Sequence, residues 1–480
     1  MRIGQTAGIF FIARILASLT GFVAMVYFAR VLGSSVLGVY FLVLALIGWL
    51  RLFNNFGVSR ALNKRVSEGA ERGQHIIAAL TLYGAAFLVI ALFLFVFRDW
   101  VNAYLGESLV LVVVILLAVE ILLRFVNTVM KGEQLVHANG ILGLLKTILR
   151  VVFQVTAVAL GFSLTGLLFG KIAALGFAAI IGSVVTVLYF DRNYDIKRPT
   201  RNHYRSLIDY AKFSWLGDMK GKIYQRMDII VLGFFSSTSL IGIYSICWNI
   251  AQFLEIFSKS LSTTMFPEMS EVSSEERMAV VDSYVEDALA YAGLFIIPGF
   301  VGAVVLGQGV LNIYGSEFQQ GYPILLLLLG GTLIHGYHKQ LMNTLDAVNR
   351  PDLTFRVNVF FAVANISLNV ILVYLYGWIG AAIATFLSVG AAMLISYRML
   401  SGLLAFSVPH EQILSQVLSA AVMGCLIAGL ARGLESIGID PVRVVPVFGL
   451  VSVGVFVYFG TLTLISNEFR RIVANNTPKL

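Results

Sequence analysis

The sequence predicts an all-α fold that crosses a membrane many times. Its 480 residues are 58% hydrophobic and only 12% charged, and the mean hydropathy is +0.86. Soluble proteins carry about 25% charged residues, so this composition excludes the soluble globular class. Apolar segments long enough to cross a bilayer follow one another along the chain, and the two halves of the sequence resemble each other.

A bilayer-spanning helix needs roughly 20 mainly apolar residues, and fourteen segments meet this requirement. The first is interpreted as a span and not as a cleavable signal, because Arg14 interrupts its apolar run. All fourteen are too long and too uniformly apolar to be strands of a membrane barrel. In chain order they are 7–31, 36–56, 76–97, 108–130, 138–161, 165–190, 207–235, 239–265, 285–307, 322–346, 353–376, 379–400, 412–431 and 445–466.

Short motifs recur in the same order in the two halves of the chain. Gly38-Val39-Tyr40 returns as Gly242-Ile243-Tyr244, and Asn127-Thr128 returns as Asn343-Thr344. Short matches also arise by chance in apolar sequence, but their shared order favours a duplicated unit. Repeated helical bundles are typical of alternating-access transporters, whose substrate site lies between the repeats.

The duplication predicts a division of the chain into four parts. Residues 1–190 form an N-terminal lobe of six helices, and residues 207–400 form a C-terminal lobe of six. A basic cytoplasmic linker, 191–206, joins them, and 401–480 adds two further spans and a tail.

Loop charges predict the orientation in the membrane. With the N-terminus inside, seventeen Lys and Arg residues fall on the inner side and four on the outer side. Cytoplasmic loops of membrane proteins are enriched in Lys and Arg, so both termini are predicted to be cytoplasmic. The net charge of +8 therefore reflects membrane orientation, and no nucleic-acid partner is expected.

The sequence lacks the common signatures of catalysis and cofactor binding. It contains no phosphate-binding GxxxxGK[ST] loop, no HExxH and no GxSxG, so neither an enzyme nor an ATP-driven pump is expected. Cys247 and Cys425 lie in apolar segments with no metal-ligand spacing. His335 and His338 lack a third ligand, so neither a metal nor a cofactor is expected.

Ionisable residues inside the predicted spans are the main functional signal. A charge at the bilayer centre costs about 2.5–3.5 kcal/mol on insertion scales, so such residues face a cavity or a partner. Lys146 and Arg150 lie four residues apart on one helical face, and Arg226 lies in another span. Because acidic residues near them in sequence are scarce, these three favour a hydrated cationic cavity.

Other polar residues in the spans are open to two interpretations each. Three acidic residues are candidates either for ion coupling or for ion pairs that brace the bundle, namely Glu120, Asp218 and Glu255. Each has a basic residue four positions further on, in the same order Arg124, Lys222 and Lys259, so each can pair within its own helix. Lys171, near a helix end, is expected to snorkel toward the interface. Asn358, Asn365 and Asn369 form a stripe that contacts sugar hydroxyls or joins helices.

Four loosely patterned stretches carry a family resemblance. They are Ala29–Gly33 with Gly38–Tyr40, Phe266–Ser270, Asn343–Pro351 and Gly377–Ala382. With fourteen predicted spans, they resemble the multidrug/oligosaccharidyl-lipid/polysaccharide exporter superfamily. The similarity is greatest to its polysaccharide-transporter branch, the O-antigen and repeat-unit flippases.

The resemblance implies a flippase that moves a lipid-linked oligosaccharide across the plasma membrane by alternating access. The lipid carrier would be of the polyprenyl or dolichyl phosphate type, and the pathway would make cell-surface glycan or glycoprotein. Glycosyltransferases or an oligosaccharyltransferase are possible partners beside membrane lipids, with H+ or Na+ as a possible coupling ion. The residues that would line the cationic cavity and bind the phosphate are Arg14, Arg51, Lys146, Arg150, Lys222 and Arg226.

Two alternative functions are considered, and the second belongs to a different functional class. A cation or drug antiporter of the same fold would use Asp218 or Glu120 as its proton-coupled acid. A membrane-embedded glycan polymerase or ligase would usually carry a large catalytic loop outside the membrane, and every predicted outer loop is short.

Overall fold

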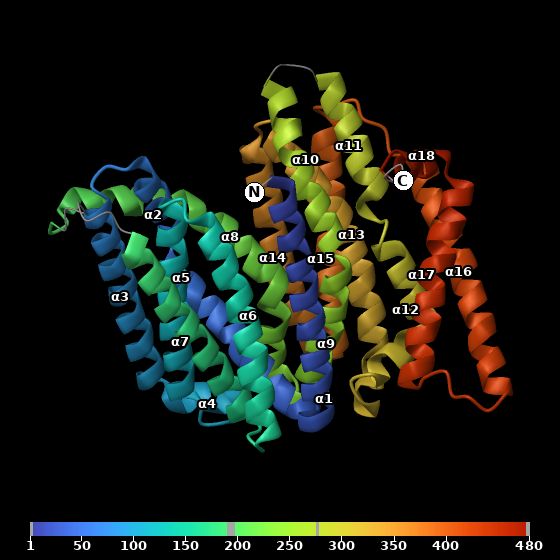
Figure 1. Ribbon diagram of the computed structural model, residues 1–480, viewed down its shortest axis with the longest axis horizontal. Helices are drawn as coiled ribbons and strands as arrows, with labels where there is room; N and C mark the ends of the chain where they lie inside the picture. Colours follow the sequence, from blue (N-terminus) through green and yellow to red (C-terminus); the bar gives the residue numbers. More distant parts are fainter. Residues whose placement is uncertain (1–2, 190–196, 275–277, 477–480) are drawn as a thin grey trace. The chain divides into compact units, whose positions relative to one another are not determined.

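The computed structural model describes residues 3–189, 197–274 and 278–476. Within these ranges the regular structure consists of α-helices and one 3-10 helix (Figure 1). The predicted all-α membrane fold is therefore confirmed. Ten helices of the described residues are long and apolar enough to cross a membrane, so the number of fourteen spans remains a prediction.

The chain forms two compact units, Met1–Gly242 and Ile243–Leu480. The division into lobes at 191–206 remains a prediction. The helices of the first unit are α1 (Ile3–Asn55), α2 (Val58–Glu68), α3 (Arg72–Val96), α4 (Arg98–Leu105), α5 (Val110–Gly132), α6 (Val136–Ala159), α7 (Leu164–Tyr189), α8 (Arg201–Phe235) and the start of α9 (Thr238–Leu254).

The second unit contains the rest of α9 and the C-terminal helices. These are α10 (Ile256–Ser274), α11 (Met278–Ala292), α12 (Ile296–Asn312), the 3-10 helix η1 (Ser316–Gly321), α13 (Tyr322–Ala347), α14 (Pro351–Tyr376), α15 (Trp378–Ser401), α16 (His410–Ser436), α17 (Val444–Ile465) and α18 (Asn467–Asn476).

Helix α1 contains the first two predicted spans, 7–31 and 36–56, with a kink between them. Gly33 at the kink has φ 77° and ψ 173°, which is outside the helical region. Glycine adopts a positive φ without the steric cost that a Cβ brings. The residue at position 33 therefore lets the chain turn between the two parts of the helix.

The start of α9 crosses α1 at the repeated glycines. A Cβ at Gly38 would overlap the carbonyl group of Thr238, and a Cβ at Gly242 would overlap that of Ser34. The hydroxyl oxygens of Ser34 and Ser239 lie 2.6 Å apart, and those of Ser35 and Thr238 lie 2.9 Å apart. Because 34 and 35 correspond to 238 and 239 at the repeat offset, the contact is reciprocal, as in a two-fold arrangement.

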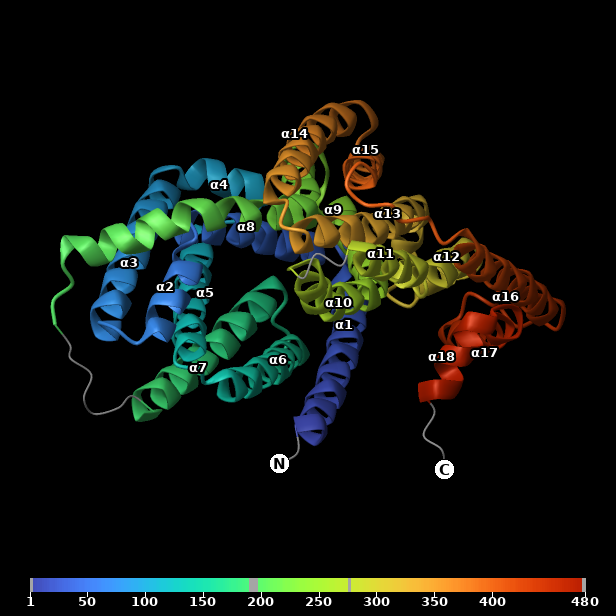
Figure 2. The ribbon, with the colours of Figure 1, turned by 90° about the horizontal axis from the view of Figure 1, so that it is seen from above.

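Helix α5 is central in the first unit, where it contacts α1, α2, α3, α6 and α7. Helix α7 packs against α5 and α6, and α1 packs against all three (Figures 1 and 2). The short helix α2 lies at one end of the unit, where it contacts α5 and α8, and α4 lies at the opposite end (Figure 1). Gly132 allows the close approach of α5 to α2, since a Cβ there would lie 2.7 Å from Val66.

In the second unit, α13 is the central helix, and it packs against α10, α11, α12, α14 and α15. Helices α16 and α17 pair with each other and contact α12 (Figure 1). Their apolar contact includes Met423, Ile427 and Tyr458, all nearly inaccessible to solvent. Many outward-facing side chains are apolar and exposed, as expected for helices in contact with lipid tails.

Candidate functional site: a cationic cavity in the first unit

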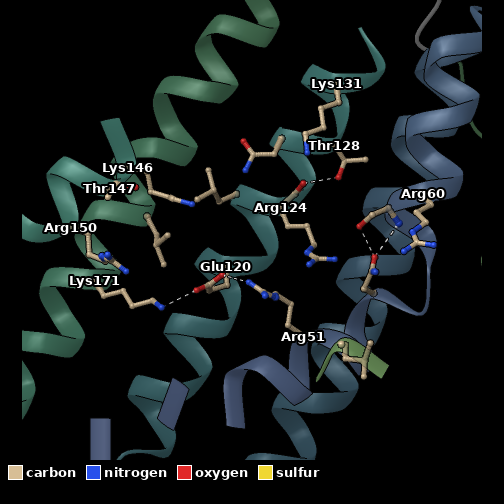
Figure 3. Close-up of a pocket in the computed structure, with 17 residues that line it drawn as sticks. Arg51, Arg60, Glu120, Arg124, Thr128, Lys131, Lys146, Thr147, Arg150 and Lys171 are labelled. Carbon is tan, nitrogen blue, oxygen red and sulfur yellow. Dashed lines mark hydrogen bonds and ion pairs between the residues drawn. The ribbon is translucent and has the colours of Figure 1, made fainter. Parts of the chain in front are cut away.

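A cavity of about 730 Å³ opens inside the first unit, between α1, α2, α5, α6, α7 and α8. This volume is typical of pockets that take organic ligands. Its lining within the described residues includes seven basic side chains and a single acidic one (Figure 3). The basic residues are Arg51, Arg60, Arg124, Lys131, Lys146, Arg150 and Lys171, and the acidic residue is Glu120.

Glu120 accepts contacts from two different helices. The Arg51 Nη1 of α1 lies 2.6 Å from Glu120 Oε2, and the Lys171 Nζ of α7 lies 3.3 Å from Glu120 Oε1 (Figure 3). The side chains of Glu120 and Lys171 are each only 13% exposed. Both carboxylate oxygens of the only acidic residue in the described lining therefore already face a cation.

Lys146 and Arg150 line the cavity from one face of α6, as the four-residue spacing predicted. Lys146 lies within electrostatic range of Arg150, Lys171 and Arg51, and of Glu120. One carboxylate shared among several cations leaves an excess of positive charge, so the site favours an anionic ligand.

Four basic residues of the lining were not predicted as binding residues. The expected snorkelling of Lys171 is wrong, because its ammonium group points into the unit and pairs with Glu120. Arg124 and Lys131 follow Glu120 along the same face of α5, at intervals of one and three turns. That stripe is readable from the sequence, whereas Arg60 joins the site only because α2 packs against α5.

The repeated Asn127-Thr128 motif also lines the cavity. Asn127 accepts a hydrogen bond of 2.9 Å from Asn139 of α6, and the Thr128 hydroxyl bonds to the Arg124 carbonyl at 2.8 Å. In the second unit, Thr344 makes the same bond back to the Gln340 carbonyl at 3.0 Å. The motif thus supports helix geometry in both units and exposes polar groups to the cavity in the first.

Three of the predicted residues have side chains outside the described part of the structure. They are Arg14 in α1 and Asp218 and Lys222 in α8. Arg226 is described; it lies half-buried in α8, within electrostatic range of Arg51 and Tyr40. Among the residues of α8, Gly221 lines the cavity. The roles of Arg14, Lys222 and Arg226 in binding the phosphate remain predictions, and so does the role of Asp218 as a coupling or structural acid.

The other predicted polar residues lie in the second unit. Glu255 is fully buried and contacts Lys259 and His335 at 3.0 and 3.1 Å. Asn365 and Asn369 are also buried, and Asn365 donates hydrogen bonds to Thr385 and Ser388 of α15. These bonds join α14 to α15, while a contact of Asn358, Asn365 or Asn369 with sugar remains a prediction.

Comparison with known proteins places the chain in a family. Residues 3–273 match the family described as polysaccharide biosynthesis protein. Over 480 residues, the chain is 29% identical to a probable low-salt glycan biosynthesis flippase of Haloferax volcanii, with 98% of this chain and 97% of that protein covered.

Two solved structures share the fold. A lipid II flippase, MurJ, in an inward closed conformation, aligns with a TM-score of 0.79 at 16% identity, over 97% of this chain and 99% of that one. An inward-facing multidrug resistance transporter of the MATE family and MOP superfamily aligns with a TM-score of 0.67 at 14% identity, over 80% of this chain and 95% of that one. The matched region covers more than half of the sequence, and the chain belongs to the polysaccharide biosynthesis protein family.

Proposed function

We propose that the protein is a flippase that moves a lipid-linked oligosaccharide across the membrane by alternating access. The observation that carries the proposal is the cationic cavity, which has seven basic side chains around one paired carboxylate. A phosphate-linked glycan is anionic and polar, and it cannot cross about 30 Å of hydrocarbon unaided. The full-length similarity to a probable glycan biosynthesis flippase supports the same function.

The cavity chemistry fits the phosphate end of such a substrate. Arg gives planar, bidentate hydrogen bonds to phosphate oxygens, and Lys adds point charges. Lys146 and Arg150 on α6 and Arg124 on α5 supply both types within one space (Figure 3). We assign the phosphate of the lipid carrier to these residues, while the lipid tail stays in the bilayer.

The same cavity disfavours transport of cationic drugs, the alternative function for this fold. A cationic ligand would face seven basic residues and only one carboxylate, which already contacts Arg51 and Lys171. Like charges within one cavity repel each other. The structural similarity to the MATE transporter shows that the two proteins share a fold. It does not identify the substrate, which we infer from the charge of the cavity.

Translocation by the purified protein tests the function directly. In liposomes with a fluorescent polyprenyl-diphosphate oligosaccharide on both leaflets, a membrane-impermeant quencher reports the outer fraction. We expect the protein to make the inner pool accessible within minutes, whereas liposomes without protein retain it. Equal rates with and without protein, for glycolipids of several compositions, would contradict the proposal.

Orientation is a second expected result. We propose a plasma-membrane protein with both termini in the cytoplasm, which places α2 inside and the turn between α4 and α5 outside. After Cys247 and Cys425 are replaced by Ala, a Ser67→Cys variant should resist a membrane-impermeant thiol reagent in intact cells. A Glu107→Cys variant should react, because both positions are exposed in the structure. The opposite labelling pattern would overturn the orientation.

A further inference from the structure

A second group of buried ionisable side chains lies in the second unit, away from the cationic cavity. Glu255 has a side chain with no exposed surface, and its two carboxylate oxygens face different helices. Oε1 lies 3.1 Å from Nδ1 of His335 on α13, and Oε2 lies 3.0 Å from Nζ of Lys259 on α10. A buried ionisable cluster at a helix interruption is typical of ion sites in transporters.

Two neighbouring helical segments are interrupted near Glu255. Glu255 is the turn residue that separates α9 from α10, and residues 293–295 separate α11 from α12. Gly336 on α13 lies against both breaks, since a Cβ there would lie 3.2 Å from Ile296 and 3.3 Å from Ser258 Oγ. Ser258 Oγ also donates a bond of 3.3 Å to the Gly336 carbonyl. The carboxylate therefore sits where two broken helices meet a third.

The hydrogen-bond geometry assigns the protons of His335. Its Nδ1 faces a carboxylate oxygen, which only accepts, so Nδ1 carries a hydrogen and donates it. A further proton therefore binds at Nε2. In this protonation a hydronium ion gives up a proton and becomes water. The proton forms an N–H bond at Nε2 and produces an imidazolium beside the Glu255 carboxylate. Histidine is the side chain whose ordinary titration falls between about pH 5 and 8.

The charged groups around the pair are few in the described part of the unit. Lys259 on α10 and Lys339 on α13 are within electrostatic range of Glu255. His338 lies beside the pair, with its ring centroid 6.1 Å from that of His335, and its Nδ1 lies 3.1 Å from Ser396 Oγ of α15. Three ionisable groups of α11 have partners elsewhere: Glu286 bonds to Ser407, Tyr291 bonds to Glu468, and Asp287 lies within electrostatic range of Glu468. The sequences of α12 and of the membrane-spanning middle of α14 contain no Asp, Glu, Lys, Arg or His.

Whether His335 holds the additional proton depends on the position of Lys259. With Lys259 on Glu255, a proton on His335 places the carboxylate between two cations, and Lys339 adds a third nearby. Lys259 is the exposed member, at 36%, and it also donates to Gln252 at 2.8 Å. If α10 shifts relative to α13, Lys259 can move away from Glu255. The Glu255 carboxylate then interacts with the imidazolium alone, and His335 binds its proton more strongly.

From this geometry we infer that Glu255 and His335 form a proton-binding site, with Lys259 as its competitor, through which a proton gradient drives the transport cycle. The inference rests on the proposed flippase function and adds its driving ion. A site that binds the proton in one arrangement of α10 and α13 and releases it in the other couples that proton to the conformational change. The chain lacks an ATP-binding loop, and a proton site supplies an energy source that needs none.

Two measurements test the site, one of which does not depend on transport. In histidine-labelled protein in nanodiscs, NMR should show a titrating imidazole that disappears in His335→Gln and moves by at least about one pH unit in Glu255→Gln, a tenfold change in proton affinity. His335→Gln keeps a hydrogen-bond donor for Glu255 and should fold. In His338→Gln, which changes a buried histidine whose ring lies beside that of His335, the titrating His335 signal should persist. Absence of a titrating His335 signal overturns the inference whatever the transport result.

In proteoliposomes, an imposed pH difference should shift the steady-state ratio of glycolipid between leaflets by about tenfold per pH unit for one coupled proton. His335→Gln and Glu255→Gln should abolish this shift, and His338→Gln should keep it. A wild-type protein that moves glycolipid without any response to the gradient overturns the proton site and leaves the flippase function standing. A protein that moves no glycolipid, with His335 titrating as expected, contradicts the flippase function instead.

Discussion

Replacing Arg150 by Gln is expected to slow glycolipid translocation about 10- to 100-fold without loss of folding. Arg150 lines the cavity from α6, one turn from Lys146 (Figure 3). A charge-assisted hydrogen bond contributes about 1.5–3 kcal/mol, and its loss in the substrate complex corresponds to that range of rates. Like charges one turn apart on a helix repel, so the substitution should leave thermal stability unchanged or raise it slightly.

The control for Arg150→Gln is the same change at an exposed position of the first unit. Arg205, 81% exposed, pairs with Asp209 at the helix surface, at 3.5 Å. Arg205→Gln should therefore translocate at the wild-type rate. Rates come from the liposome assay, and stability comes from a melting curve of the purified protein in detergent. An Arg150→Gln protein that is folded and fully active would remove Arg150 from the phosphate site.

Replacing Glu120 by Gln is expected to destabilise the protein by about 3–5 kcal/mol, the cost of removing one partner from a buried ion pair. The change leaves Arg51 and Lys171 without their shared carboxylate, in a cavity that is already rich in positive charge. Three helices, α1, α5 and α7, meet at this carboxylate. Its loss therefore affects packing of the unit as well as the charge of the site.

A second substitution separates the ion-pair effect from a general packing effect. Lys171→Met in the Glu120→Gln protein removes one of the two stranded cations and keeps the length of the side chain, so part of the stability should return. Glu68→Gln is the matched control, because that carboxylate pairs with Arg65 and Lys64 on an exposed helix surface. It should leave the melting curve unchanged. Equal stability of Glu120→Gln and wild type would show that Glu120 does not brace the unit.

The two predictions assign opposite roles to residues of one cavity. Glu120, with 13% of its side chain exposed, joins helices, whereas Arg150 lines the cavity and is predicted to bind the ligand. In the sequence, the cation nearest to Glu120 at helical spacing is Arg124, four residues further on. In the structure Glu120 forms ion pairs with Arg51 and Lys171. The difference arises because α1 and α7 bring cations from distant parts of the sequence to the same carboxylate.

The amino-acid sequence by itself determined the class of the protein and the sign of its site. Length and apolarity of the segments require helices in a membrane, because an unpaired backbone in lipid costs several kcal/mol per group. The four-residue spacing of Lys146 and Arg150 placed both on one helix face, since that geometry depends only on the local helical repeat. The charge excess in the spans indicated a cationic cavity before any contact was known.

Only the tertiary structure decided which charges meet. Arg60 lines the cavity because α2 packs on α5, and Lys171 points inward because Glu120 lies opposite it. His335 and Glu255 are 80 residues apart and touch because two broken helices pack against α13. The reach of a side chain across helices depends on crossing angle, rotation and the small residues that permit close approach, such as Gly132 and Gly336. These quantities come from the packing of the whole unit, and no local sequence pattern encodes them.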